Sequence, residues 1–275
     1  MSGANAFSKV HPESVLVLTL DSCRFDTAAS TTTPNLSAVG PLRRAMAPGH
    51  FTFSSHAAFW VGTTPGIPQS REPVLNPKAG RLFRLANARA PAQPGDVFVL
   101  EGRSVPQGFR RLGHRAIGTG SVAWFDLETE PGRWLTEDFD RFEYVRGPGS
   151  LPKQLTWLGK ELSGLEGKPV FAFLNVGETH VPYWHPGASW SPRDNPCVPF
   201  GERNDAETCR TRQSLCLAWA DAALGPLLEA FSGATILACA DHGDCWGEDG
   251  LWEHGIWHEK TMEVPLWVRV RGLPC

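Results

Sequence analysis

Residues 15–26 of the chain read VLVLTLDSCRFD, and this stretch decides the fold. Its first six residues form a predominantly apolar run that ends at Asp21. Such a run is typical of a strand that is buried on both faces and delivers a polar side chain at its carboxyl end. We therefore expect a sheet covered by helices, with polar residues gathered where its strands end.

Further segments repeat this pattern along the chain. Short β-rich runs bounded by Gly, Pro or charged residues occur at residues 97–100, 170–175, 235–240 and 266–270. Helical patterns separate them at residues 55–61, 106–112, 151–162 and about 205–231. The alternation predicts an α/β three-layer sandwich with a central, mostly parallel sheet and helices on both faces. Residues 62–94 and 182–201 are rich in Pro and Gly and are expected to be long loops over the active face.

The composition is that of an ordinary globular enzyme. The 275 residues are 41% hydrophobic and 20% charged, so a sizeable core is available and we expect one catalytic domain over residues 1–275. The formal net charge of −3 argues against a protein that neutralises a nucleic-acid backbone. A small-molecule or carrier-bound substrate fits better.

The N-terminus and the cysteines bear on location. Residues 1–10 contain one Lys and no long apolar run, so we expect no signal peptide, no membrane segment and a cytoplasmic protein. Seven Cys residues without CxxC spacing fit reduced thiols, although Cys197 and Cys209 could pair.

Polar residues that directly follow the predicted strands are the first candidates for chemistry, because ligands bind beyond the carboxyl ends of such strands. They are Asp21 with Arg24 and Asp26 behind it, then Glu178 and His180, then Asp241 and His242. Carboxylates and imidazoles that converge from separate strands make a site for a divalent metal. The alternative is structural, with Asp21 capping a turn and residues 241–243 forming another.

Four landmarks follow one another along the chain. They are residues 15–26 with Thr33-Pro34-Asn35-Leu36, residues 47–66 (APGHFTFSSHAAFWVGTTPG), residues 171–183 (FAFLNVGETHVPY) and residues 240–268 (ADHGDCWGEDGLWEHGIWHEKTMEVPLWV). In content and order they resemble the sulfatase and phosphodiesterase branch of the alkaline phosphatase superfamily. Weaker matches at residues 113–116 and 139–142 extend the resemblance over nearly the whole chain.

The nucleophile position departs from the sulfatases of this family. They carry Cys or Ser in a C-x-P-S-R pattern that becomes formylglycine, whereas this chain has Thr52-Phe53-Ser54-Ser55-His56. A Thr cannot become formylglycine, but its hydroxyl can attack phosphorus when a metal stabilises the alkoxide. Thr52 also stands just before a predicted helix, whose amides would receive phosphoryl oxygens. An ordinary helix cap is the alternative reading.

The resemblance implies a role for each site residue. Asp21, Asp241 and His242 would bind the metal, and Thr52 would bridge it to the substrate. His180 would contact the transferred group and His254 would lie near the leaving-group oxygen, either one donating a proton or a hydrogen bond. The expected cofactor is one tightly bound Zn²⁺ or Mn²⁺. A second metal site is a competing role for the same histidines.

The other candidates carry weaker roles. Arg24 would orient Asp21 or touch substrate, with a plain salt bridge to Asp26 as the alternative. Glu178 is expected to be structural, and His185 and His258 to lie at the surface or in a lining. His50 and His56 flank Thr52, and a phosphate contact there is a hypothesis.

The leading function is hydrolysis of a phosphomonoester, phosphodiester or phosphonate ester through a covalent phospho-Thr52 intermediate. The alternatives are a phosphoryl-group transferase that uses the same intermediate, a sulfatase-like hydrolase and an inactive metal-binding module. Relatives commonly carry a further C-terminal subdomain, and we expect this chain to lack it and to have an open or loop-covered site suited to a bulky substrate. Loops around Trp184 and Trp190 would supply its recognition surface.

Overall fold

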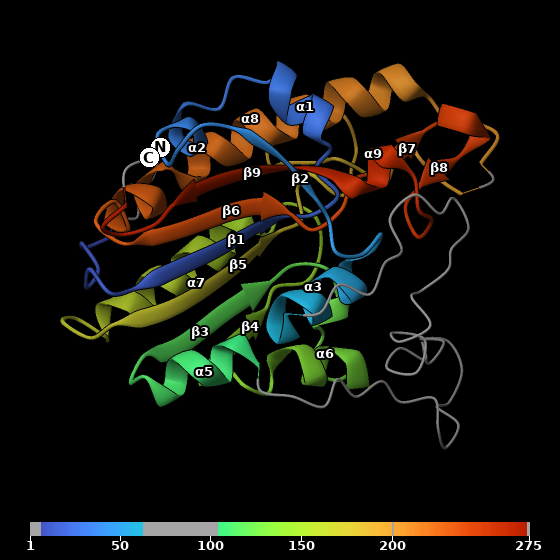
Figure 1. Ribbon diagram of the computed structural model, residues 1–275. Helices are drawn as coiled ribbons and strands as arrows, with labels where there is room; N and C mark the ends of the chain where they lie inside the picture. Colours follow the sequence, from blue (N-terminus) through green and yellow to red (C-terminus); the bar gives the residue numbers. More distant parts are fainter. Residues whose placement is uncertain (1–6, 63–103, 200, 274–275) are drawn as a thin grey trace.

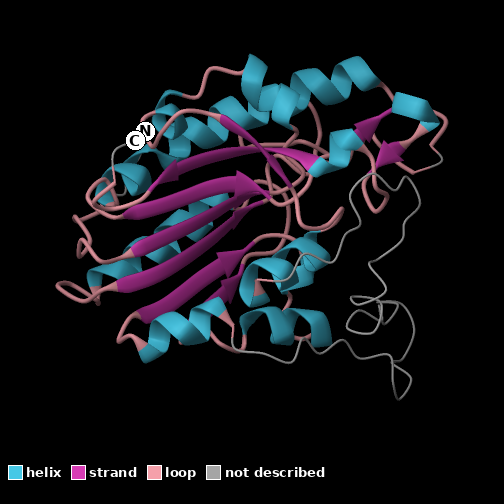
Figure 2. Ribbon diagram, in the orientation of Figure 1, coloured by secondary structure: helices cyan, strands magenta, loops and turns pink. Residues whose placement is uncertain are grey.

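A seven-stranded sheet forms the centre of the protein (Figures 1 and 2). The computed structural model describes residues 7–62, 104–199 and 201–273. In spatial order the strands are β2 (Arg43–Met46), β9 (Glu263–Arg269), β6 (Thr235–Ala240), β1 (Val15–Leu20), β5 (Val170–Val176), β3 (Arg115–Gly120) and β4 (Arg141–Tyr144). The strands from β6 to β4 run parallel, and β9 and β2 add an antiparallel edge. The predicted mostly parallel sheet is confirmed.

Helices cover both faces of the sheet. One face carries α1 (Phe25–Ser30), α2 (Pro34–Ser37), α7 (Leu151–Ser163) and α8 (Ala206–Ala230), and the other carries α3 (Thr52–Val61), α5 (Val105–Arg111) and α6 (Glu130–Thr136). Side chains of β1 alternate between the two cores, since Leu16 and Leu18 pack with α7 and α8 while Val15 and Val17 pack with α3 and α6. This arrangement is the predicted three-layer α/β sandwich.

Three strands of the sheet, β2, β3 and β4, were not predicted from the sequence. In β3 the letters RAIGTG dilute the apolar signal with two glycines. Packing explains the second of them, because a Cβ on Gly120 would lie 2.4 Å from Cγ of Phe125. β2 and β4 lie at the two edges of the sheet and are half polar. The strand expected at residues 97–100 and most of the loop expected at 62–94 lie outside the described residues.

A small antiparallel hairpin stands beside the sheet. It consists of β7 (Cys245–Trp246) and β8 (Trp252–Glu253), with Cys245 opposite Glu253. Asp244 directly precedes the hairpin and His254 directly follows it, so pairing of the two strands brings these side chains together. Within the described ranges, no helix has the length and apolar character needed to cross a membrane.

The helix α2 is capped by a carboxylate from a distant part of the chain. Asp221 of α8 is buried and accepts hydrogen bonds from the backbone N–H of Asn35 (3.2 Å) and Leu36 (2.8 Å) and from the Asn35 side chain (3.0 Å). These bonds join α2 to α8, which lies in the same helical layer.

Replacing Asp221 with Ala is expected to lower the free energy of unfolding by about 2–4 kcal/mol, because one buried and two partly buried donors lose a charged acceptor. Urea denaturation measures this. Glu207→Ala is the control, since Glu207 lies on the same helix with an exposed side chain and should change stability by less than about 0.5 kcal/mol. Equal losses in the two variants would show that the cap contributes little.

Candidate active site

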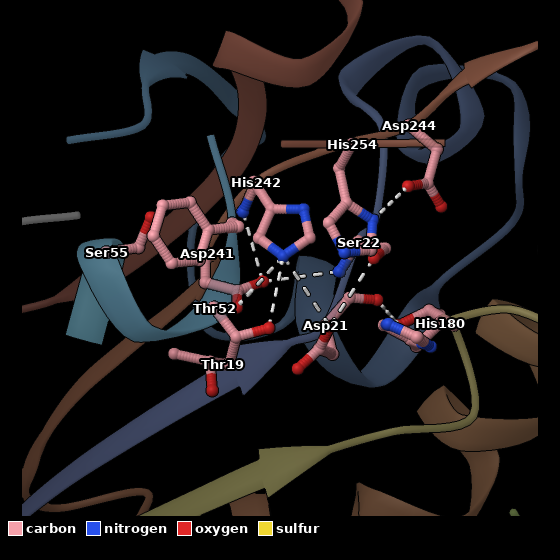
Figure 3. A network of polar contacts seen from close by, with 12 residues as sticks. Thr19, Asp21, Ser22, Thr52, Ser55, His180, Asp241, His242, Asp244 and His254 are labelled. Atoms are coloured by element: carbon pink, nitrogen blue, oxygen red, sulfur yellow. Dashed lines mark hydrogen bonds and ion pairs between the residues drawn. The ribbon is translucent and has the colours of Figure 1, made fainter. Parts of the chain in front are cut away.

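The candidate site lies where β1 and β6 end. These neighbouring parallel strands are aligned so that Leu20 pairs with Ala240, and the residues that follow them, Asp21 and Asp241, therefore emerge side by side. Thr52 approaches from the opposite helical layer as the first residue of α3. The helix begins three residues earlier than the sequence pattern indicated. Figure 3 shows Asp21, Thr52, Asp241 and His242 converging on one point.

The distances among these side chains suit a metal ion. Nε2 of His242 lies 3.8 Å from Oδ1 of Asp21 and 3.5 Å from Oδ2 of Asp241, and one ligand atom from each residue lies within 4.8 Å of the other two. The Thr52 hydroxyl lies 3.3 Å from the same His242 nitrogen. All four side chains are buried.

The buried carboxylates at this site favour the binding of a cation. Asp241 Oδ1 accepts hydrogen bonds from the backbone N–H of Ser22 and His242, but Oδ2 has no hydrogen-bond partner in the described structure. Burial and the adjacent Asp21 raise the pKa of Asp241 well above its usual range. Burial also lowers the pKa of His242 to about 3, which leaves its ring neutral and able to bind metal. Two carboxylates, a neutral imidazole and a hydroxyl fit a divalent transition metal.

A polar network fixes the first of these carboxylates. Asn175 of β5 donates to Oδ2 of Asp21 at 3.0 Å, and the Thr179 hydroxyl donates to the Asp21 carbonyl at 2.7 Å. Asn175 also reaches Thr19 at 3.3 Å, and Thr19 contacts Nε2 of His56 at 3.1 Å. The strand β5 thereby orients a side chain that belongs to β1.

The two histidines beside Thr52 have different surroundings. His56 is fully buried, its Nδ1 lies 2.8 Å from the Thr52 carbonyl, and burial lowers its pKa to about 4. Its ring packs between α3 and the aromatic core, and Nδ1 lies 3.6 Å from Oδ2 of Asp241, so the suggested phosphate contact by His56 stays a prediction. His50 is buried with no hydrogen-bond partner at either ring nitrogen among the described residues. Its pKa is lowered by burial first and then by His254.

His254 and His180 line the open side of the site. The His254 ring lies 4.3 Å from the His242 ring and 5.2 Å from the His180 ring, measured between centroids. Nδ1 of His254 lies 2.7 Å from Oδ1 of Asp244. Burial lowers the pKa of His254, but the Asp244 carboxylate outweighs this and the net shift is upward. His242, Asp244 and His254 also bring ligand atoms within 4.8 Å of one another, which is the geometry for a second metal.

Sequence reasoning missed three residues behind His254. Asp244 accepts a hydrogen bond from the Tyr183 hydroxyl at 2.7 Å, and the Trp246 indole donates to that hydroxyl at 2.8 Å. The only available signal was proximity in sequence, since Asp244 stands two residues after His242 and Tyr183 three residues after His180.

The remaining candidates lie outside this cluster. Arg24 is buried, pairs with Asp26 and Glu248 and lies 4.0 Å from the Trp246 ring centroid, so it serves as a salt bridge. Glu178 accepts from the Leu151 N–H at 2.8 Å at the start of α7, and burial raises its pKa to about 7.

Two further histidines and two cysteines are also accounted for. His185 stacks on Trp219 at 5.3 Å, and His258 caps α9 (Glu259–Met262). Cys197 and Cys209 are buried free thiols in this structure.

Comparison with known proteins gives a fold but no close relative. No protein-family model matches the chain, and a search of curated proteins finds no match. Among solved structures, the periplasmic domain of phosphoethanolamine transferase EptC from Campylobacter jejuni is similar, with a TM-score of 0.59 at 13% identity, covering 96% of this chain and 83% of that one. Phosphonate monoester hydrolase from Agrobacterium radiobacter has a TM-score of 0.62 at 15% identity, covering 94% and 68%. Lipoteichoic acid synthase LtaP from Listeria monocytogenes has a TM-score of 0.57 at 11% identity, and the match covers 98% of this chain and 68% of that one.

These comparisons contradict the cytoplasmic location expected from the sequence. The similar EptC structures from Campylobacter jejuni and Escherichia coli are periplasmic domains. The integral membrane protein EptA from Neisseria meningitidis is also similar, and this chain covers 49% of it. Where a domain of this fold is one part of a longer chain, the residues of the domain do not set its location.

Proposed function

We propose that this chain, which has the fold of the alkaline phosphatase superfamily, is a metal-dependent enzyme that cleaves phosphate-type esters with Thr52 as nucleophile. The observation that carries the proposal is the position of the Thr52 hydroxyl, 3.3 Å from His242 Nε2 and beside two buried carboxylates. A hydroxyl at this point can be deprotonated only where positive charge is supplied, and the donor set is one that holds a divalent cation. As proposed ligands, Asp21, Asp241, His242 and Thr52 make up this set.

The residues around Thr52 divide the work of the reaction. A divalent metal, when bound, supplies positive charge that stabilises the alkoxide and the transferred group. Thr52 attacks phosphorus and becomes esterified as the alcohol leaves. The helix α3 begins at Thr52, and its N-cap residue Phe51 contributes no side-chain cap, so the first amides can receive non-bridging oxygens.

Departure of the alcohol needs a proton, and His254 is placed to supply it. Asp244 holds Nδ1 of His254, which leaves Nε2 as the working nitrogen, and it also raises the pKa of the ring. His180 faces His254 and can donate a hydrogen bond to the transferred group. Water then cleaves phospho-Thr52, and His254, which has given up its proton, can accept the proton of this water.

Transfer to an alcohol in place of water is the second candidate function. It is favoured by the similarity to the structures of EptC and EptA, which are phosphoethanolamine transferases. Both reactions share the phospho-Thr52 intermediate and differ only in the acceptor.

A panel of p-nitrophenyl esters tests the proposal. Monoesters, diesters and phosphonate esters are assayed with the metal-reconstituted protein beside the matching sulfate ester. We expect at least one phosphate-type ester to turn over far better than the sulfate, since the formylglycine precursor is absent. In assays with an added alcohol, the ratio of the phosphorylated alcohol to the hydrolysis product measures how much of the reaction is transfer. A preferred sulfate ester would contradict the proposal.

Asp244→Asn is expected to lower kcat about 10- to 100-fold and to shift the basic limb of the kcat–pH profile to lower pH. The sign follows from His254: its carboxylate partner raises its pKa, so without that charge the ring loses its proton at a lower pH and acid catalysis fails earlier. Profiles of kcat against pH measure the shift. Asp194→Asn, at an exposed ion pair with Arg212, is the control. An unmoved basic limb would separate His254 from proton transfer.

A further inference from the structure

A cavity of about 460 Å³ opens beside the proposed reaction centre. It lies at the carboxyl ends of β3, β4 and β5, and it is lined by Ser121 after β3, by Tyr144 and Arg146 at the end of β4, and by His180 after β5. His180 therefore faces both the cavity and His254. The volume falls in the range that holds a small organic ligand, which is roughly 300–1,000 Å³.

The floor of the cavity is joined to the proposed metal ligands. The Ser121 hydroxyl lies 3.2 Å from both the backbone oxygen and Oδ1 of Asn175, the side chain that also donates to Asp21. Gly177 allows this close approach, since a Cβ there would lie 2.4 Å from Oγ of Ser121. A group in the cavity would thus lie against the same strand end, β5, that orients the first carboxylate.

The walls offer two kinds of contact. Val122, Pro148 and Pro182 provide an apolar surface. Arg146 also lines the cavity, forms an ion pair with Asp126 at 2.8 Å and has its guanidinium carbon 5.8 Å from the Tyr144 ring centroid. The Asp126 side chain is 14% exposed and that of Arg146 76% exposed, so both remain within reach of a ligand.

The charge of these walls selects the ligand. Arg146 and Asp126 neutralise each other, so the pair has no net charge to attract a second phosphate. It does present N–H donors next to a carboxylate acceptor, an arrangement that matches neighbouring hydroxyls, each of which both donates and accepts. A Tyr ring and an apolar wall suit the C–H faces of a saturated ring.

We propose that this cavity binds the alcohol part of the ester, and that this alcohol is a polyhydroxylated ring of sugar type, held by Arg146 and Asp126. The inference rests on the proposed function, because it assigns the substrate class of that same site. Arg146 and Asp126 act as specificity-determining residues and take no part in the attack by Thr52.

Two esters that differ only in their alcohol test the inference. The p-nitrophenyl panel first identifies the ester class that the wild type turns over best. The glucose 6-yl ester and the hexyl ester of that class are then compared as substrates. We expect the wild type to prefer the glucose ester by tenfold or more. Arg146→Ala should lower kcat/KM for the glucose ester about 10- to 100-fold, mainly through KM, because a charged hydrogen bond is lost. For the hexyl ester it should change kcat/KM less than about twofold.

Arg141→Ala is the matched control, because Arg141 is the first residue of β4, pairs with Glu161 and does not line the cavity, whereas Arg146 follows the end of the same strand. It should leave both esters unchanged. The inference is overturned if the wild type shows no preference, or if Arg146→Ala affects both esters alike. A wild type that turns over neither ester, nor any p-nitrophenyl ester, would overturn the proposed function as well.

Discussion

Thr52→Ala is expected to lose several orders of magnitude in turnover of the best phosphate-type ester while the fold stays intact. A methyl group cannot attack phosphorus. When residues act together as one catalytic unit, the loss of any one of them removes most of the rate enhancement. Thr52→Ser should be much milder, because its hydroxyl keeps the route through a covalent intermediate. Steady-state kinetics on the three proteins measure the losses.

Two controls make the result interpretable. Thr156→Ala removes an exposed Thr of α7 and should leave turnover unchanged. Mass spectrometry of acid-quenched reactions should find one phosphoryl group on Thr52 in the wild type and none in Thr52→Ala. Near-normal turnover by Thr52→Ala would refute the nucleophile assignment.

Removal of divalent metal is expected to abolish activity, and Zn²⁺ or Mn²⁺ should restore it better than Ca²⁺. The reason is the proposed ligand set, in which the His242 imidazole favours transition metals over hard cations. Without a cation, burial and the adjacent Asp21 favour the protonated form of Asp241, and the Thr52 hydroxyl stays protonated. Chelation, metal analysis and reconstitution with each ion measure the dependence.

Asp241→Asn supplies the matched variant for the metal experiment. It keeps the size of the side chain but removes one charge from the proposed ligands, so metal affinity should fall. Asp194→Asn should bind metal as the wild type does. Full activity of a protein shown by metal analysis to be free of metal would remove the cation from the mechanism.

The strand ends of the site could be predicted because their signal is local. Asp21, Asp241 and His242 each follow an apolar run directly, and the parallel sheet then brings two such ends together. Thr52 came from the resemblance alone, since an isolated Thr before a helix reads as a cap.

The parts that sequence reasoning missed depend on contacts between distant residues. Tyr183 and Asp244 are separated by 61 positions, and no local pattern announces their hydrogen bond. The same holds for Asp221, which caps a helix 186 residues before it. β3 was hidden because glycines that make room for aromatic rings weaken the apolar signal of a strand.

The sheet places the proposed reaction centre and the proposed alcohol-binding cavity on different strands. Three of the proposed metal ligands, Asp21, Asp241 and His242, follow β1 and β6, whereas the cavity is built on β3, β4 and β5. Asn175 connects the two parts through its hydrogen bonds with Asp21 and Ser121. If the cavity binds the alcohol as we propose, substitutions in the segments after β3 and β4 are expected to alter the accepted alcohol without displacing the carboxylates. Such a division lets evolution explore new substrates while the bond-breaking step is conserved, which is how one fold comes to serve many functions.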